Sequence, residues 1–427
     1  MRIYKNNKKF YSYLFDKLFP IHRSIVNPGY NKSLKILNFF INFNLIKLKS
    51  GKKIFGWTIP MSWEVDDAYI ITPQQKKICK FKLNNLHLMG YSMPFNKTLS
   101  LQNLKKILTT NKKMPNAIPF TYSFYKKKIG MNIAFNDYKR LKKGNYRVVI
   151  KSKFKKSNLV IGEKKLSGLS NKTFLISSYL CHPSMANNEL SGPLVLLGVF
   201  KEIEKWKFRN LNYNFVINPE TIGSIGYIFS RKKYLIKNLK AGLVLTCLGG
   251  PRNILTYKKT RVENSQLNFL FKKINKEKKI KISNYSSLSG SDERQYCSPG
   301  INLAVGQISR TTYLQYKEYH SSSDNKKFMK IEKILKSIKE ISKFIYYFDH
   351  LCGIIKRNQE CCETYLEKYN LYKDKRNNKV TKTILTFLGH CDEGSILEII
   401  DKYNLSLDDS VEAINLLKKK KIIKVIY

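Results

Sequence analysis

Polar side chains that could bind a metal or move a proton are concentrated in the stretch Cys181-His-Pro-Ser-Met-Ala-Asn-Asn-Glu-Leu-Ser-Gly192. An apolar run ends at Leu180 and a helical pattern begins at Leu194, so the stretch follows a buried strand and precedes a helix. In open α/β sheets, ligands and metals collect beyond the carboxyl ends of the strands. This is the position in which a hydrolase would hold a metal.

Other polar groups also follow predicted strands: Pro219-Glu-Thr-Ile-Gly223, Cys247-Leu-Gly-Gly250 and Tyr319-His-Ser-Ser-Ser-Asp324. A polar loop, Ser291-Asp-Glu-Arg-Gln-Tyr296, lies between the last two. A hydrolytic zinc site needs imidazole and carboxylate ligands, an open position for water and a nearby carboxylate base. His182 and His320 can supply two ligands, and Glu220 can supply the base.

Each of these residues also has an ordinary structural explanation. A single histidine is more often hydrogen-bonded within a fold than bound to a metal, and Glu220 could cap the helix that follows it. The run Asp292-Glu-Arg294 could be a solvated charged turn. Cys181 and His182 are adjacent, and adjacent residues of a strand point to opposite faces, which disfavours a Cys–His nucleophile.

The order of the elements predicts the α/β class, with a mixed, mostly parallel sheet covered by helices on both faces. Strands are expected at Phe174–Leu180, Tyr213–Ile217, Leu243–Cys247 and Asn302–Gln307, alternating with helices at 194–206, 225–238, 265–275 and 330–349. Two further helices are expected at 11–19 and 33–48. The zone 51–150 is broken by prolines into short β-like runs, which indicates a separate, mainly β region.

The expected domains are therefore a discontinuous core (1–50 and 151–352), an inserted mainly-β domain (51–150), a linker (353–379) and a C-terminal domain (380–427). The linker is polar, rich in lysine and partly helical. Capping patterns at Ser395 and Ser406 open two of three short helices in the last domain, and a strand at Ile422–Ile426 closes it. This order predicts a winged helix.

Composition narrows the class of protein. The 427 residues carry 79 Lys+Arg against 30 Asp+Glu, a net charge of +49. The lysines are spread along the whole chain, as codon bias would produce, so we expect nonspecific polyanion binding at low salt and no specific nucleic acid partner. Eight scattered cysteines without a C-x-x-C pair indicate reduced thiols. No apolar run suits a membrane helix, and a cytoplasmic protein is expected.

The order His182, Asn188-Glu-Leu-Ser-Gly192, Glu220-x-x-Gly223, Ser291-Asp292 and His320 resembles the co-catalytic zinc aminopeptidases of the bacterial leucyl-aminopeptidase type. The chain is more closely similar to bacterial aminopeptidase-like proteins, some of which are called polysaccharide biosynthesis proteins with an aminopeptidase-like domain. The matching stretches are Leu18–Ser24, Met89–Pro94, Cys181–Pro193, Pro219–Ser224, Ser291–Gly300 and Glu318–Ser321. They are long and specific, and they span most of the chain.

The resemblance implies a zinc-aminopeptidase-like core, an inserted domain and a C-terminal winged helix. His182 and His320 match metal-binding histidines, and Glu220 matches the general base. Three carboxylate ligands of the family are replaced: Asn188 stands at the bridging aspartate, Thr221 at a glutamate ligand, and Gly249-Gly250 near an aspartate ligand. One zinc ion is therefore expected, held by His182, His320 and a third group, for which Asn188, Glu189 and Asp292 are the candidates.

The leading hypothesis is a metallopeptidase-type hydrolase that cleaves an amide or peptide bond with metal-activated water and Glu220 as general base. Its partner would be a small peptide or amide substrate, with Asp292, Glu293, Arg294 and Tyr319 as substrate-binding residues; a homo-oligomer is possible, and no membrane partner is expected. The missing carboxylates motivate an alternative, a catalytically degenerate binding or scaffold protein. A winged-helix DNA-binding regulator ranks third.

Overall fold

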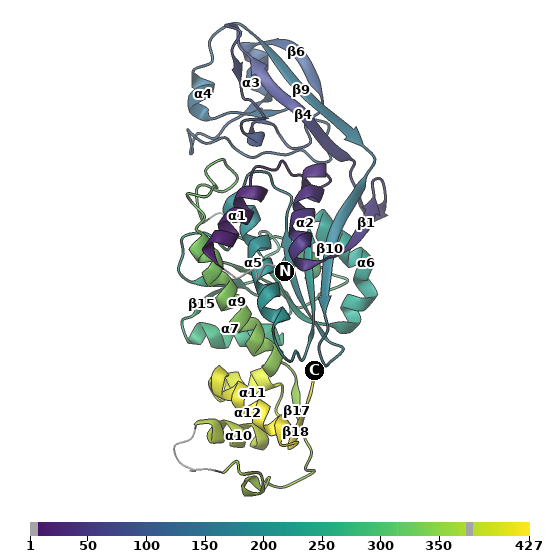
Figure 1. Ribbon diagram of the computed structural model, residues 1–427, viewed down its shortest axis with the longest axis vertical. Helices are drawn as coiled ribbons and strands as arrows, with labels where there is room; N and C mark the ends of the chain where they lie inside the picture. Colours follow the sequence, from purple (N-terminus) through teal and green to yellow (C-terminus); the bar gives the residue numbers. More distant parts are fainter. Residues whose placement is uncertain (1–6, 314, 373–378) are drawn as a thin grey trace.

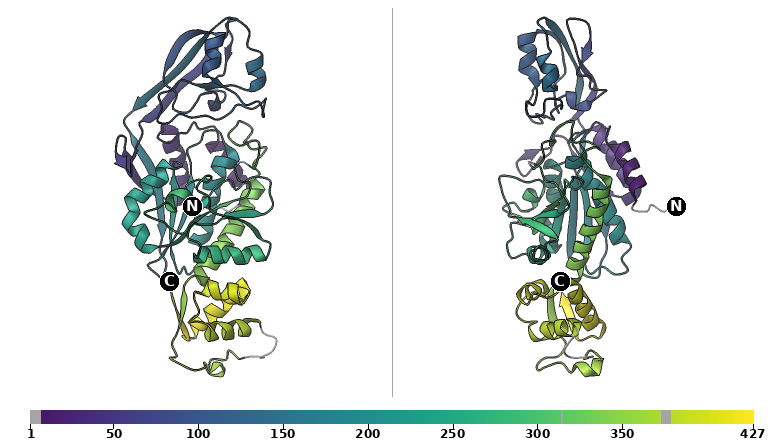
Figure 2. Two further views of the ribbon diagram at one scale, coloured as in Figure 1. Left: turned by 180° about the vertical axis from the view of Figure 1, so that it is seen from behind. Right: turned by 90° about the vertical axis from the view of Figure 1, so that its left-hand side faces the viewer.

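The computed structural model describes residues 7–313, 315–372 and 379–427, which are arranged in three parts along one long axis (Figure 1, Figure 2). An antiparallel sheet with short helices occupies one end, and a larger sheet with its helices lies in the middle. Short C-terminal helices and a two-stranded sheet form the other end. The predicted catalytic and metal-binding residues all belong to the middle part, so the large sheet decides how they are placed.

The central sheet contains eight strands. They are β1 (Asn44–Lys49), β10 (Asn158–Leu166), β11 (Thr173–Tyr179), β12 (Asn212–Asn218), β13 (Leu239–Leu245), β14 (Leu255–Lys258), β15 (Ile280–Ser283) and β16 (Val305–Ser309). Their order is β1-β10-β12-β11-β13-β16-β14-β15, and the four middle strands are parallel. On the two sides, β10 runs antiparallel to β12 and β14 antiparallel to β16. The mixed, mostly parallel sheet predicted from the sequence is confirmed.

Helices cover both faces of this sheet: α1 (Lys8–Leu18), α2 (Pro28–Ile41), α5 (Ser191–Glu204), α6 (Ile222–Asn238), α7 (Gln266–Lys276), α8 (Glu293–Tyr296) and α9 (Ile331–Leu351). Alternate residues of β11 enter different apolar clusters. Phe174 and Ile176 belong to the large cluster that includes α5 and α9, whereas Leu175 belongs to a smaller one that includes α6. Burial on both faces explains why β11 reads as a continuous apolar run.

The helix expected at 33–48 is placed differently. It begins at Pro28, after the N-cap residue Asn27, and ends at Ile41 because Asn42 takes a left-handed conformation with φ 58°. The residues that follow form β1, which pairs antiparallel with β10. The partner strand lies far away in the sequence, so the local pattern alone could not distinguish this strand from a helix.

The inserted region forms a second, four-stranded antiparallel sheet, of order β5-β4-β9-β6. The inserted region as a whole contains β2 (Lys53–Ile54), β3 (Trp57–Thr58), β4 (Ser62–Ile71), β5 (Lys77–Ile78), η1 (Asn85–His87), β6 (Phe95–Ser100), α3 (Leu101–Ile107), β7 (Leu108–Thr109), β8 (Met131–Asn132), α4 (Phe135–Lys139) and β9 (Asn145–Lys155). Strand β9 crosses the boundary expected at residue 150, because it continues to Lys155 before the chain turns into β10.

The C-terminal part contains α10 (Lys379–Gly389), α11 (Ile396–Lys402), α12 (Leu407–Lys419) and β18 (Ile423–Ile426). The predicted capping box is present, with Ser395 and Glu398 bonding reciprocally at the start of α11. The segment expected as a linker holds β17 (Ile354–Arg357) and η3 (Leu366–Tyr369), and β17 pairs antiparallel with β18. The winged-helix assignment itself stays a prediction. None of the described helices combines the length and apolarity needed to cross a membrane.

Candidate active site

Two neighbouring parallel strands bring the centre of the predicted site together. Tyr179 at the end of β11 pairs with Asn218 at the end of β12, so the two segments leave the sheet side by side. His182 follows the first strand and Glu220 the second. The His182 Nε2 atom lies 3.5 Å from the Glu220 Oε2 atom. The structure therefore places these two predicted residues next to each other, at the carboxyl edge of the sheet.

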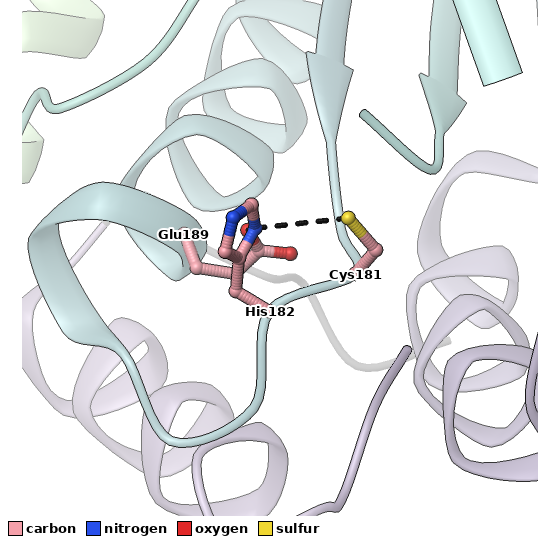
Figure 3. Close-up of side chains that lie close together, drawn as sticks. All are labelled: Cys181, His182 and Glu189. Atoms are coloured by element: carbon pink, nitrogen blue, oxygen red, sulfur yellow. Dashed lines mark hydrogen bonds and ion pairs between the residues drawn. The ribbon is translucent and has the colours of Figure 1, made fainter. Parts of the chain in front are cut away.

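A short π-helix (η2, Ala186–Leu190) returns Glu189 to the His182 ring (Figure 3). The Nδ1 atom of His182 lies 2.7 Å from Glu189 Oε2, and 3.6 Å from the sulfur of Cys181. An imidazole that donates through Nδ1 presents its Nε2 lone pair on the other side of the ring, which is the arrangement of metal-binding histidines supported by a carboxylate. Burial lowers the pKa of His182, but Cys181 and the Glu189 carboxylate together raise this pKa well above its ordinary value, so the ring carries a second proton that a bound ion would displace from Nε2.

Neighbouring groups hold the Glu220 side chain in place but leave its Oε2 atom available. The hydroxyl of Ser291 donates to its Oε1 atom at 2.5 Å, and its backbone N–H contacts the Cys181 sulfur at 3.3 Å. Partial burial raises the pKa of Glu220, and His182 and Ser291 oppose that shift. The N-cap of α6 is Thr221, with φ 63° and no side-chain cap. Glu220 is thus not a helix cap, and its Oε2 atom remains available beside His182.

The acidic residues of the 291–296 loop support the site from inside the fold. Asp292 is fully buried and accepts hydrogen bonds from Thr221 N, Asn218 Nδ2 and Ser224 Oγ at 2.7, 2.9 and 3.0 Å. Burial, followed by the charge of Glu220, raises the pKa of Asp292 to about 7. Because its oxygens are occupied, Asp292 is in no position to meet a substrate, and the expected substrate contact is replaced by support for the turn that carries Glu220.

Glu293 is likewise used inside the fold, whereas Arg294 keeps a buried Nε atom without a hydrogen-bond partner and its substrate-binding role stays a prediction. The Glu293 carboxylate is buried, lies 2.9 Å from Lys258 Nζ and accepts a hydrogen bond from the N–H of Ser291. Arg294 donates to the carbonyl of Ser287. These bonds fix the loop that presents Ser291, which is a role the sequence pattern did not reveal because it depends on Lys258 from β14.

The loop after β16 brings His320 to the same place. The ring centroids of His182 and His320 are 5.5 Å apart, and the buried Nε2 atom of His320 has no hydrogen-bond partner. Burial, together with the nearby charge of His182, lowers the pKa of His320 to about 3, so its imidazole is neutral. Tyr319 stacks on His320 at 3.9 Å, and burial, followed by the charge of Glu220, raises the pKa of Tyr319.

Asn188, the third predicted metal ligand, is engaged elsewhere. Its Oδ1 atom accepts a hydrogen bond from the Tyr179 hydroxyl at 3.2 Å and contacts the Cys247 sulfur at 3.8 Å. Its backbone N–H donates to Asp324, which anchors the π-helix. The amide oxygen therefore serves the packing of the helix, and the prediction that it binds a metal finds no support in these contacts.

The described residues contain one close group of potential metal ligands. Within the described residues, three potential ligand atoms lie within 4.8 Å of one another only for Cys181, His182 and Glu189. In that group the His182 Nδ1 and Glu189 are already bonded to each other, and burial raises the pKa of the Cys181 thiol to about 11, which keeps the thiol neutral. The group supports the imidazole. Outside those contacts, the His182 Nε2 atom beside Glu220 and the unpartnered Nε2 atom of His320 are the groups that could bind an ion.

Arg23 is a further part of the site that the chemistry of the motifs did not predict. This fully buried guanidinium donates to the carbonyl of His182 at 3.1 Å and to the carbonyl of Leu18 at 2.6 Å. Burial lowers the pKa of Arg23 to about 10, and the charge of Glu189 opposes the shift. The stretch Leu18–Ser24, singled out for its resemblance alone, thus ties the N-terminal segment to the backbone of His182.

Comparisons with known proteins agree with this architecture. A family model described as a domain of unknown function (DUF4910) matches residues 12–350. A Clostridium acetobutylicum protein named as a polysaccharide biosynthesis protein with an aminopeptidase-like domain is 36% identical over 362 residues, 84% of this chain and 82% of that protein. A crystal structure from the same organism, whose description suggests a peptidase, is 32% identical with a TM-score of 0.86, covering 97% of this chain and 95% of that one.

More distant solved structures share the fold. The zinc aminopeptidase BSAP from Bacillus subtilis has a TM-score of 0.56 at 12% identity, over 78% of this chain and 94% of that one. A peptidase M28 precursor from Shewanella amazonensis has a TM-score of 0.53 at 14% identity, over 79% and 91% of the two chains. The chain therefore belongs to the DUF4910 family, and it has the fold of the zinc aminopeptidases.

Proposed function

We propose that the protein is a metal-dependent hydrolase of aminopeptidase type that cleaves an amide or peptide bond. One observation carries the proposal: the neutral imidazole of His320 has a buried and unpartnered Nε2 atom and lies next to His182, whose own Nε2 atom is 3.5 Å from Glu220. A buried imidazole nitrogen without a partner is costly unless something binds it. The fold shared with zinc aminopeptidases supports the same conclusion.

The side chains of the site would then divide the work. A bound zinc ion would polarise the carbonyl of the scissile bond and make water more acidic. Glu220 would take the proton from the attacking water and pass it to the leaving nitrogen. Ser291 keeps the carboxylate of Glu220 oriented through Oε1, and Glu189 keeps the imidazole of His182 oriented through Nδ1. His182 and His320 would hold the ion.

Metal content tests the proposal first. We expect about one zinc ion per chain in protein purified without chelator, because two imidazoles suit zinc and three carboxylate ligand positions are lost. Elemental analysis should show the ion lost from His182→Ala and His320→Ala and retained in the control His390→Ala, since His390 lies in the C-terminal part. Absence of metal even after dialysis against zinc would favour the noncatalytic scaffold, and two tightly held ions would contradict the single-ion site.

A second prediction concerns Glu189. Replacing it with glutamine keeps the size of the side chain but removes the charge that supports the His182 imidazole, so we expect zinc affinity to fall roughly 10- to 100-fold, the usual effect of such a supporting group. Competition with a chromogenic chelator would measure the affinity, with the exposed Glu263→Gln as the matched control. Unchanged affinity in a folded Glu189→Gln protein would show that His182 does not depend on this carboxylate.

The substrate search has two starting points. Aminoacyl amides and short peptides follow from the aminopeptidase fold, and amide-bearing sugars follow from the name of the Clostridium acetobutylicum relative. A panel of both, assayed with the zinc-loaded chain for release of amine, would give the first activity. A chain that holds its zinc and cleaves none of them would move the balance toward a binding protein.

A further inference from the structure

The segment 118–125 of the inserted region, here called the wall segment, is bonded to the loop that carries His320. The N–H of Phe120 donates to the carbonyl of His320 at 2.8 Å, and the N–H of Ser322 donates to the carbonyl of Ile118 at 2.9 Å. His320 has a φ of 52°, a left-handed conformation that costs a histidine free energy. The inserted region therefore holds a strained loop of the core in the conformation that presents His320.

The wall segment also supplies a ring to the centre of the site. The ring of Phe120 lies 5.2 Å from the ring of His182 and 5.1 Å from the ring of His320, in edge contact with the latter. Phe120 is nearly buried, at 9% exposure. One side of the two imidazoles is thus covered by a residue that the inserted region provides.

Beyond Phe120 the rings become accessible. Tyr122 lies 5.5 Å from Phe120, stacks on Phe124 at 4.3 Å and is 49% exposed. The cavity that Phe120, Tyr122 and Phe124 line together with His182 holds only about 10 Å³, so a bound ring would lie on the exposed side of Tyr122. Tyr125 is 50% exposed and meets Trp57, itself 40% exposed, at 6.1 Å. Exposed aromatic faces that continue outward from a reaction centre are typical of a binding surface, because isolated folds rarely leave several of them together.

We propose that the wall segment is a substrate subsite, and that it selects a substrate bearing a six-membered ring with an apolar face beside the amide. An aromatic side chain and a pyranose share this chemistry, since both can place an apolar face of the ring against a tyrosine ring. The inference rests on the proposed function for the position of the amide. It assigns to the inserted region the recognition of the group next to the cleaved bond.

Three amide-bearing probes test the subsite on the full zinc-loaded chain. L-phenylalaninamide and N-acetyl-D-glucosamine carry a ring, and L-alaninamide does not. Titration calorimetry gives Kd for a probe that is not cleaved and KM for one that is. We expect a ring-bearing probe to bind roughly tenfold tighter than alaninamide, as one stacking contact would produce. Tyr122→Ser should lower the affinity for the ring-bearing probe to that for alaninamide, and Tyr13→Ser, at an exposed tyrosine on α1, should leave both affinities at their wild-type values.

The outcomes separate the two proposals. Ring preference that disappears in Tyr122→Ser upholds the wall segment, whether or not the probe is cleaved, and the preferred probe tells an aromatic group from a pyranose. Cleavage of all probes without ring preference overturns the wall segment and leaves the hydrolase standing. If Tyr122→Ser melts well below wild type, Tyr125→Ser takes its place, and a retained preference in that folded variant counts against the subsite.

Discussion

Replacement of Glu220 by glutamine is expected to lower kcat/KM for amide hydrolysis roughly a hundredfold or more, while the protein folds and keeps its metal. Glutamine preserves the size of the side chain and can still accept the hydrogen bond from Ser291, but it cannot take a proton from water. A positioned general base usually contributes 10²- to 10⁴-fold. The Oε2 atom of Glu220, 3.5 Å from His182 Nε2, is in place for this role.

Two other roles for Glu220 give different results. If Glu220 is itself a metal ligand, Glu220→Gln loses zinc together with activity, which elemental analysis of the purified variant would show. If it only stabilises the turn before α6, the melting temperature falls while kcat/KM stays near that of wild type. Glu263→Gln, on an exposed part of the chain, sets the baseline for a neutralised glutamate.

Replacement of Asp292 by alanine is expected to destabilise the protein by about 2–4 kcal/mol and to lower kcat as well. The N–H of Thr221 and one Nδ2 hydrogen of Asn218 lose their acceptor, whereas Ser224 Oγ keeps the carbonyl of Thr221, and each unsatisfied donor costs roughly 1–3 kcal/mol. The raised pKa of Asp292, about 7, shows that burying its charge is itself costly, so part of the loss is recovered. Thermal and urea unfolding would measure the change in the free energy of unfolding.

The Asp292→Ala variant also distinguishes two roles of Asp292: support of the turn that carries Glu220, and direct contact with a substrate. A substrate contact would raise KM and leave the stability intact, whereas a supporting residue lowers stability and kcat together because Glu220 moves with its turn. Asp392→Ala, an exposed aspartate in the C-terminal part, should change neither. A normal melting curve for Asp292→Ala with an increased KM would restore the substrate role that its place in a polar loop first indicated.

The sequence by itself determined the architecture of the core and the edge of the sheet at which chemistry is expected. Apolar strands such as Phe174–Leu180, alternating with amphipathic helices, predict a mostly parallel sheet. Neighbouring parallel strands align their carboxyl ends, as β11 and β12 do. His182 and Glu220 are close because each directly follows a neighbouring strand. The sequence left open whether the two strands are neighbours, and the pairing of β11 with β12 in the folded sheet answers that question.

The tertiary structure decided what no local pattern carries. Residues 44–48 had to be a strand because β10, more than a hundred residues away, pairs with them. In the sequence, Asp292 and Glu293 resemble solvated charges. In the folded chain they are bonded by Thr221 and Lys258, which belong to other parts of the sequence. The Arg23 contact with His182 and the wall segment against His320 likewise join distant parts of the chain. Such roles depend on partners brought together by folding, so a residue's type and its neighbours in sequence do not specify them.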